Sequence, residues 1–168
     1  MNGGKWRYLM DAAPRKLPVF EDVCAELTGE MMDAVFTCDA CDYAEASDGV
    51  KTIQMLGHSM NAVALPKDGK LVYRFEVEKA GDYTLQTALI PTQPNDNGDL
   101  RYSVSIDGGE PTIFNLKEPF RSEEWKQNVL RGQALREQKM HLSVGQHTMT
   151  IRALDAHIII DQFSCVPL

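Results

Sequence analysis

The second half of the chain contains two stretches in which apolar and polar residues alternate with a period of two. Residues 101–106 carry their apolar side chains on one face, and residues 147–153 repeat the pattern. Asp107 and Gly108 follow the first stretch, and both residue types tolerate the positive φ that a tight hairpin turn requires. The pattern is typical of antiparallel strands with one buried and one solvated face, and it argues against a helix-flanked parallel sheet.

The first half of the chain adds further strands with the same period. In residues 71–77, four apolar side chains share one face while Arg74 and Glu76 occupy the other. A short turn leads to the apolar run 83–90, so these two runs are predicted to pair as a hairpin. Shorter strand-like runs lie at residues 34–38, 51–56, 61–66 and 157–163.

Three segments depart from this strand pattern. Residues 91–99 contain two prolines, one glycine and four Asn or Asp residues, which is the strongest loop signal in the chain. Ser122 is placed to cap a short helix over residues 123–130. Residues 130–144 suit either a helix or a polar edge strand, and the strand is favoured. Together these features predict an all-β chain, an antiparallel β-sandwich of jelly-roll type with one short helical insertion.

The length of 168 residues fits one domain with a real core, and the hydrophobic content of 43% and charged content of 24% are ordinary for a globular protein. Residues 1–30 are predicted to form a lead-in arm that packs on the domain, with Trp6, Tyr8 and Leu9 as its anchors. Residues 31–168 are predicted to form the sandwich.

The charge balance excludes some partners. With 17 basic and 24 acidic residues, the formal charge is −7, so the chain offers no basic face to phosphates and nucleic acid is not an expected partner. No apolar run approaches the roughly 20 residues that a membrane helix needs. The first 16 residues also lack the long apolar stretch of a secretory signal.

The cysteines do not form a recognisable metal or redox motif. Cys38 and Cys41 make one C-x-x-C pair, but Cys24 and Cys165 supply no second pair at zinc-ribbon spacing. We expect thiols that are partly buried near strand ends, with metal or redox chemistry as the alternative.

A structural calcium site is the first hypothesis for the acidic residues. If the first and last strands pair, Glu45 and Asp161 are candidate ligands, with Asp42 and Asp48 nearby in the sequence. Calcium takes six to eight oxygens, so loop carbonyls would have to complete the set. The alternative is a solvated acidic loop and one aspartate at a strand end, and no other cofactor is expected.

A saccharide site is the second hypothesis. Carbohydrate modules stack sugar rings on an exposed aromatic side chain, and Trp125 lies near Arg121 and Asn128 in the sequence. Arg101 and Arg121 are candidates for an acidic sugar, because the planar guanidinium matches a carboxylate. The alternative is that Trp125 docks a helix on the sandwich.

We find no catalytic constellation. Ser59 follows His58 but lacks the G-x-S-x-G setting of a nucleophile elbow. Hydrolysis of a glycoside needs two carboxyl groups at a defined separation, and the sequence singles out no such pair.

Several segments together resemble a known family. Residues 101–116, the Trp-bearing segment 123–130 and residues 145–163 resemble the C-terminal domain of glycoside hydrolase family 115. The Gly-Lys-Trp lead-in at residues 3–20 and the Leu-Gly…Ala-Val…Pro segment at residues 53–66 fit as well.

This resemblance implies a non-catalytic, carbohydrate-binding-module-like domain of an α-glucuronidase that acts on glucuronoxylan, because the family's catalytic barrel precedes the domain and does not fit in 168 residues. The implied role is structural, in shaping the substrate approach, or in a homodimer contact, and the implied partner is the catalytic domain. The alternative is an autonomous carbohydrate-binding module for xylan or glucuronic-acid-decorated oligosaccharides. Secretion or a periplasmic location is expected from the resemblance alone.

Overall fold

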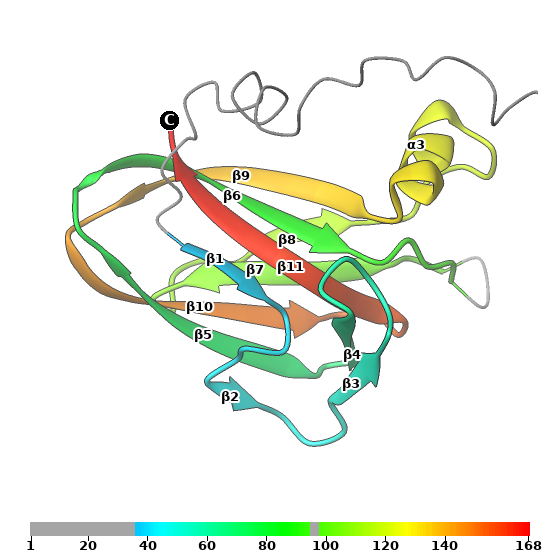
Figure 1. Ribbon diagram of the computed structural model, residues 1–168, viewed down its shortest axis with the longest axis horizontal. Helices are drawn as coiled ribbons and strands as arrows, with labels where there is room; N and C mark the ends of the chain where they lie inside the picture. The colour runs from blue at the N-terminus through cyan, green and yellow to red at the C-terminus, as the bar shows by residue number, and fades with distance from the viewer. Residues whose placement is uncertain (1–35, 95–97) are drawn as a thin grey trace, which may run out of the picture. The chain divides into compact units, whose positions relative to one another are not determined.

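A computed structural model describes residues 36–94 and 98–168, which form two antiparallel sheets packed face to face with one short helix (Figure 1). The sandwich predicted from the alternating strands is therefore confirmed. The lead-in arm, residues 1–30 with Trp6, Tyr8 and Leu9, lies outside the described residues. No helix in the described part of the chain is long and apolar enough to cross a membrane.

The first sheet is built around the last strand, which pairs along both of its edges. Its order is β3-β4-β11-β6-β9, and β1 pairs with β11 beside β4, so the predicted contact between the first and last strands is present. The six strands are β1 (Phe36–Asp39), β3 (Lys51–Gln54), β4 (Asn61–Leu65), β6 (Gly81–Leu89), β9 (Ala134–Leu142) and β11 (Ile158–Pro167).

The second sheet has five strands in the order β2-β5-β10-β7-β8. Its strands are β2 (Glu45–Ala46), β5 (Lys70–Val77), β7 (Arg101–Ile106), β8 (Thr112–Asn115) and β10 (Gly145–Ala153). β7 and β8 form the hairpin expected at Asp107-Gly108, and both turn residues have positive φ, 52° and 70°. The ambiguous segment 130–144 contains β9, an edge strand, as favoured from its composition.

The predicted hairpin between residues 71–77 and 83–90 is wrong. β5 pairs with β2 and β10 in the second sheet, whereas β6 pairs with β11 and β9 in the first. Residues 78–80 therefore carry the chain from one sheet to the other at one end of the sandwich (Figure 1). The short turn bridges two packed layers, and each strand finds its partners far away in the sequence.

The core lies between the two sheets and follows the alternation of the strands. Tyr73 meets Phe163 edge to face with ring centroids 4.7 Å apart, and Tyr102 stacks on Phe114 at 5.2 Å. Full burial of one such large apolar side chain stabilises the fold by about 1.5–3 kcal/mol. The largest fully buried side chains are Tyr102, Phe163, Leu71, Leu85, Leu89, Leu100, Met149, Ile151, Ile158 and Ile160.

The predicted helix is α3 (Glu123–Arg131), which lies between β8 and β9. The Ser122 side chain accepts a hydrogen bond from the Trp125 amide. Glu123 and Glu124 lie in the first turn, where their negative charge interacts favourably with the helix dipole. Gly132 ends the helix in the left-handed conformation, which glycine adopts without a steric cost.

Candidate functional site

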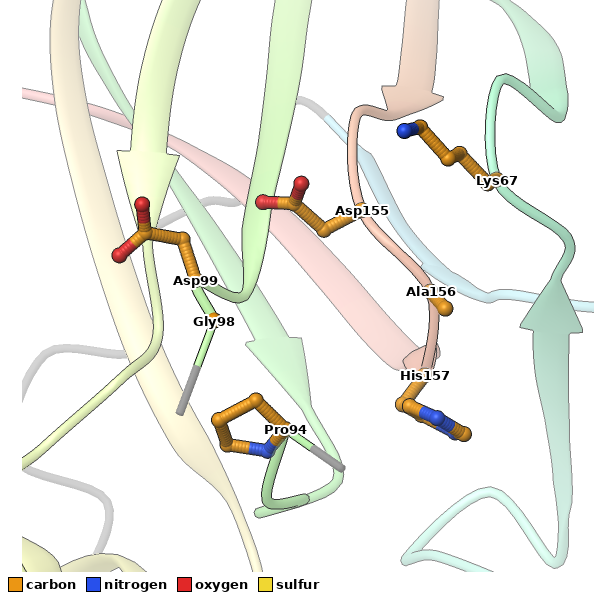
Figure 2. Close-up of a pocket in the computed structure, with 7 residues that line it drawn as sticks. All are labelled: Lys67, Pro94, Gly98, Asp99, Asp155, Ala156 and His157. Atoms are coloured by element: carbon orange, nitrogen blue, oxygen red, sulfur yellow. The ribbon is translucent and has the colours of Figure 1, made fainter. Parts of the chain in front are cut away.

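A polar hollow lies at one end of the sandwich, where three loops meet (Figure 2). This loop-end pocket has a volume of about 320 Å³. Lys67 comes from the β4–β5 turn, and Asp155 and His157 come from the β10–β11 turn. The β6–β7 loop, the strongest loop signal in the sequence, contributes Asp99. The remaining lining residues are Pro94, Gly98 and Ala156.

Arg101, one of the predicted sugar-binding residues, lies beside this pocket but is held by an internal ion pair. Its Nε and Nη2 donate to the two carboxylate oxygens of Asp155 at 2.8 and 3.1 Å, and its backbone amide donates to the same carboxylate at 2.9 Å. These hydrogen bonds lower the pKa of Asp155 and raise that of Arg101. Asp155 therefore occupies the Nε–Nη2 edge of the guanidinium, and only the Nη1–Nη2 edge is left for a second carboxylate.

The loop-end pocket is also lined by a lysine whose charge acts on Asp155. Lys67 has no hydrogen bond or ion pair among the described residues, and Figure 2 shows its ammonium directed toward Asp155. Asp99 accepts a hydrogen bond from Asn115 Nδ2 at 3.0 Å and retains further acceptor capacity. A pocket lined by an ammonium and two carboxylates can bind hydroxyl groups, but the described lining contains no Trp, Tyr or Phe ring to stack a sugar.

The other three predicted sugar-binding residues lie at or near helix α3. Arg121 and Trp125 both contact the ring of Phe120: the Arg121 guanidinium carbon lies 5.1 Å from the ring centroid, and Trp125 meets the ring edge to face at 5.2 Å. Phe120 itself is 70% exposed. The structure therefore gathers Phe120, Arg121 and Trp125 into one group, the Phe120 cluster, in which the most accessible ring is the phenylalanine.

Asn128 does not join that cluster as an accessible group. It is 3% exposed, and its Oδ1 is buried without a hydrogen-bond partner, as is Nε1 of Trp125. Buried, partnerless polar atoms cost about 1–3 kcal/mol each, so helix α3 carries two atoms that would gain from a partner. A sugar hydroxyl would have to displace covering atoms to reach either of them.

Asp161, a predicted calcium ligand, is fully buried and is instead the acceptor of a hydrogen-bond network. One carboxylate oxygen accepts from the amide of Ser59 at 3.0 Å and from its hydroxyl at 2.7 Å. The other accepts from the His58 amide at 2.8 Å and from Gln133 Nε2 at 2.7 Å. Burial opposes ionisation, but the bonds from Ser59, Gln133 and His58 outweigh it and lower the pKa of Asp161.

Glu45, the other predicted calcium ligand, pairs with Arg74 on β5 in the second sheet. Asp161 lies on β11 in the first sheet, so the two predicted ligands belong to different layers. The described residues contain no group of three or more His, Cys, Asp or Glu side chains arranged to hold a metal ion. Calcium binding stays a prediction, and within residues 36–94 and 98–168 no ligand set accompanies it.

The cysteines behave as partly buried thiols, as expected. Cys38 and Cys41 are half-buried and free, and Cys165 is buried and free. Burial, followed by the charges of Asp42 and Asp39, raises the pKa of Cys38 to about 12. A thiol with so high a pKa is almost entirely protonated near neutral pH, which argues against nucleophilic chemistry at this position. Cys24 lies outside the described residues.

Sequence reasoning missed two features of these sites. Phe120 follows Pro119 in a polar segment and has no strand or helix period that would mark it as exposed. The network of Asp161 joins residues about 100 positions apart, so no local pattern shows it; the one sequence signal is Gly57 before His58. An added Cβ at Gly57 would lie 2.2 Å from an Asp161 oxygen, and its φ is 79°.

Comparison with known structures first defines the class of fold. A family 35 carbohydrate-binding module from Clostridium thermocellum is similar at a TM-score of 0.61 and 14% identity, over 79% of this chain and 98% of that one. A family 6 module from Cellvibrio mixtus lichenase 5A, solved with cellotriose, is similar at a TM-score of 0.58 and 15% identity, over 80% and 98%. The fold is that of the carbohydrate-binding-module β-sandwiches.

Sequence comparison then gives the family. Residues 40–165 match the glycosyl hydrolase family 115 C-terminal domain, and the chain belongs to that family. A solved family GH115 4-O-methyl-α-glucuronidase with specificity for decorated arabinogalactans is similar at a TM-score of 0.76 and 28% identity. The match covers 93% of this chain but only 19% of that relative. No curated protein matches the sequence.

These findings confirm the resemblance inferred from the sequence. The chain corresponds to the non-catalytic C-terminal domain of the family, and the catalytic part is a separate domain of the longer enzyme.

Proposed function

We propose that this domain is a structural part of an α-glucuronidase that removes glucuronic acid or its 4-O-methyl ether from glucuronoxylan. The family match over residues 40–165, to a domain that makes up 19% of a solved relative, carries the proposal. The domain would support the catalytic domain, shape the approach of the polysaccharide or take part in a homodimer. A secreted or periplasmic location follows if the substrate is a plant polysaccharide.

The geometry of the predicted sugar-binding residues favours this structural role. Arg101 is occupied by Asp155, Asn128 is buried, and Trp125 packs against Phe120 with its indole nitrogen covered. Asn128 and the indole nitrogen of Trp125 are thus covered, and one edge of the Arg101 guanidinium is already bound within the domain.

The test compares the complete enzyme with a version that lacks this domain. We expect deletion to lower the midpoint of thermal unfolding, to reduce the α-glucuronidase activity or to dissociate a homodimer. The reason is that the catalytic domain loses a neighbouring domain that packs against it. A complete enzyme carrying Asp161→Asn, which weakens only the interior of this domain, is the matched variant and should show a smaller effect in the same direction. If deletion leaves stability, activity and oligomeric state unchanged, the structural role is refuted.

A second candidate function is an autonomous carbohydrate-binding module for xylan or glucuronic-acid-decorated oligosaccharides. The observation that favours it is the Phe120 cluster, where a 70% exposed ring lies beside Arg121. An exposed ring can stack on the apolar face of a sugar, and a neighbouring guanidinium can bind a uronic carboxylate.

Affinity electrophoresis in gels containing glucuronoxylan tests the second candidate. The chain should be retarded, and Phe120→Ala should abolish the retardation while the circular dichroism spectrum is unchanged. Trp125→Ala should also weaken binding, because Trp125 contacts the Phe120 ring. Lys67→Ala separates this cluster from the loop-end pocket, because it removes the cation of that pocket alone. Unretarded migration of the unsubstituted chain would eliminate this function.

A further inference from the structure

The outer face of the second sheet carries a groove along β7 that no part of the proposed function uses. Its floor is low because β7 places two small residues there, Ser103 and Ser105, while the alternate residues of the strand point into the core. On the neighbouring strand β10, Thr150 lies opposite Ser105 and Arg152 lies opposite Ser103. The groove has a volume of about 280 Å³.

The opposite side of the groove is apolar. Ile113 on β8 lies across from Ser103 and is 61% exposed. Pro111 precedes β8 on this side, whereas Leu154 follows β10 on the side of Arg152. Arg152 on β10, Ser103 on β7 and Ile113 on β8 therefore lie side by side in one row across the sheet. Ligand sites combine apolar lining with a small number of placed polar groups, and this groove offers both.

The polar side chains of the groove have no partners among residues 36–94 and 98–168. Ser103 is only 7% exposed, yet neither it nor Arg152 makes a side-chain hydrogen bond or ion pair among the described residues. Ser105 and Thr150 are also without a partner in that part of the chain.

The other two arginines of this sheet differ from Arg152. Arg74 on β5 pairs with Glu45, and Arg101 on β7 pairs with Asp155. Arg152 is thus an arginine of the sheet that lacks a carboxylate among the described residues, and it stands at the edge of a hollow lined with free hydroxyl groups.

We propose that this groove binds a uronic acid residue, as a free sugar or as a saccharide substituent. Arg152 would bind the carboxylate, the hydroxyl groups of Ser103, Ser105 and Thr150 would exchange hydrogen bonds with the sugar hydroxyls, and the C–H face of the ring would lie on Ile113. Each protein group in the groove thus has a counterpart on one uronic acid ring. The proposal does not depend on the loop-end pocket, on the Phe120 cluster or on the structural role in the enzyme.

The experiment is a titration of the ¹⁵N-labelled chain with sodium glucuronate, followed by ¹H–¹⁵N correlation spectra. A single small sugar in an open groove is expected to bind with a dissociation constant on the order of 1 mM. Saturable shifts should centre on the amides of β7, β8 and β10 around the groove. Glucose, which lacks the carboxylate, and acetate, which lacks the hydroxyl groups, should each bind about tenfold more weakly or not at all.

Two arginine variants separate the groove from the general charge of the sheet. Arg152→Gln should weaken glucuronate binding about tenfold or more, because a charge-assisted hydrogen bond is lost. Arg74→Gln removes an equal charge from the same sheet away from the groove and should leave binding unchanged. Both positions are exposed, so well-dispersed spectra of each variant will show that the fold is intact.

Three results would overturn the proposal. The first is the absence of saturable shifts at about ten times the expected dissociation constant. The second is equal loss of binding in Arg152→Gln and Arg74→Gln, which would indicate nonspecific attraction. The third is binding that maps to Phe120 or to Lys67 and is unaffected by Arg152→Gln. That last outcome would support the second candidate function while removing the groove.

Discussion

The interior of the first sheet depends on one buried carboxylate, and its replacement by an amide is a sharp test of the structure. Asp161 accepts four hydrogen bonds, two on each oxygen, from Ser59, His58 and Gln133. Asp161→Asn keeps the size of the side chain but turns one oxygen into an NH₂ donor. The asparagine amide can keep both donors on one side; on the other side the Ser59 hydroxyl can turn to accept from the new NH₂, but the Ser59 amide cannot. One of the four bonds therefore becomes a donor-to-donor contact.

The magnitude follows from that contact. A hydrogen bond to a charged group contributes about 1.5–3 kcal/mol, so the loss of one at a buried site should cost about 1.5–3 kcal/mol. Domains of this kind have a total stability of about 5–15 kcal/mol, so the change removes a substantial part of it. The effect should shrink in acid, because the lowered pKa of Asp161 gives stability that is present above its ordinary pKa of 3.8 and is lost as the pH falls through the folded-state value.

Urea unfolding of the two proteins at neutral pH, followed by tryptophan fluorescence and circular dichroism, measures the difference. Asp48→Asn is the matched control, because Asp48 is exposed and has no hydrogen bond or ion pair among the described residues. It should change the free energy of unfolding by less than about 0.5 kcal/mol. A loss below about 1 kcal/mol for Asp161→Asn would refute the network, since it is smaller than one such bond. A stabilisation of the unsubstituted protein by added calcium would instead favour the ligand role predicted for Asp161.

Two further perturbations test the same structure. Gly57→Ala should destabilise the fold by about 2 kcal/mol or more, because the position has a φ of 79° and the new Cβ meets a carboxylate oxygen at 2.2 Å. Gly108→Ala has a similar φ of 70° but open space around it, so a urea titration should show a smaller loss, and equal losses would contradict the clash. The Ser143 carbonyl and the Asp107 carboxylate, 2.9 and 2.6 Å from the two ring nitrogens of His147, raise its pKa above 6.5. Stability from this raised pKa is complete below pH 6.5 and lost as the pH rises through the folded-state value, so unfolding free energies measured from about pH 5.5 to about 8.5 should decline more in the wild type than in His147→Gln. Parallel pH profiles would disprove the pairing.

The strands were predictable from the sequence because their signal is local. In β5, four apolar residues alternate with polar ones, and the structure buries the apolar face at Leu71, Tyr73, Phe75 and Val77. The helix was predictable for a similar reason, since Ser122 and the two following glutamates act within one turn.

Strand pairing was predictable only where a turn enforces it. Asp107-Gly108 adopts the positive φ of a hairpin and joins β7 to β8. The turn between β5 and β6 contains no comparable conformational requirement, so the chain can pass to the other sheet as easily as it can fold back. The choice is made by β10 and β11, whose sequences lie some 60 or more residues further along the chain.

The candidate sites show why residue type alone does not tell which side chains are accessible to a ligand. An arginine is available to a ligand only if no carboxylate of the fold occupies it, and that carboxylate comes from a distant strand or loop. Arg101 was predicted to bind an acidic sugar, but Asp155, 54 residues away, takes two of its nitrogens. Arg152, which the sequence did not single out, alternates with buried residues in β10 like any solvated strand residue. Arg152 is distinguished by its neighbours on the two adjacent strands. Ser103, opposite it on β7, is small, and Ile113, the next residue across on β8, is exposed. Neither of these positions carries an acidic side chain. Whether a side chain on such a sheet can reach a ligand therefore depends on which residues the strand register places beside it. That register cannot be read from the sequence of one strand.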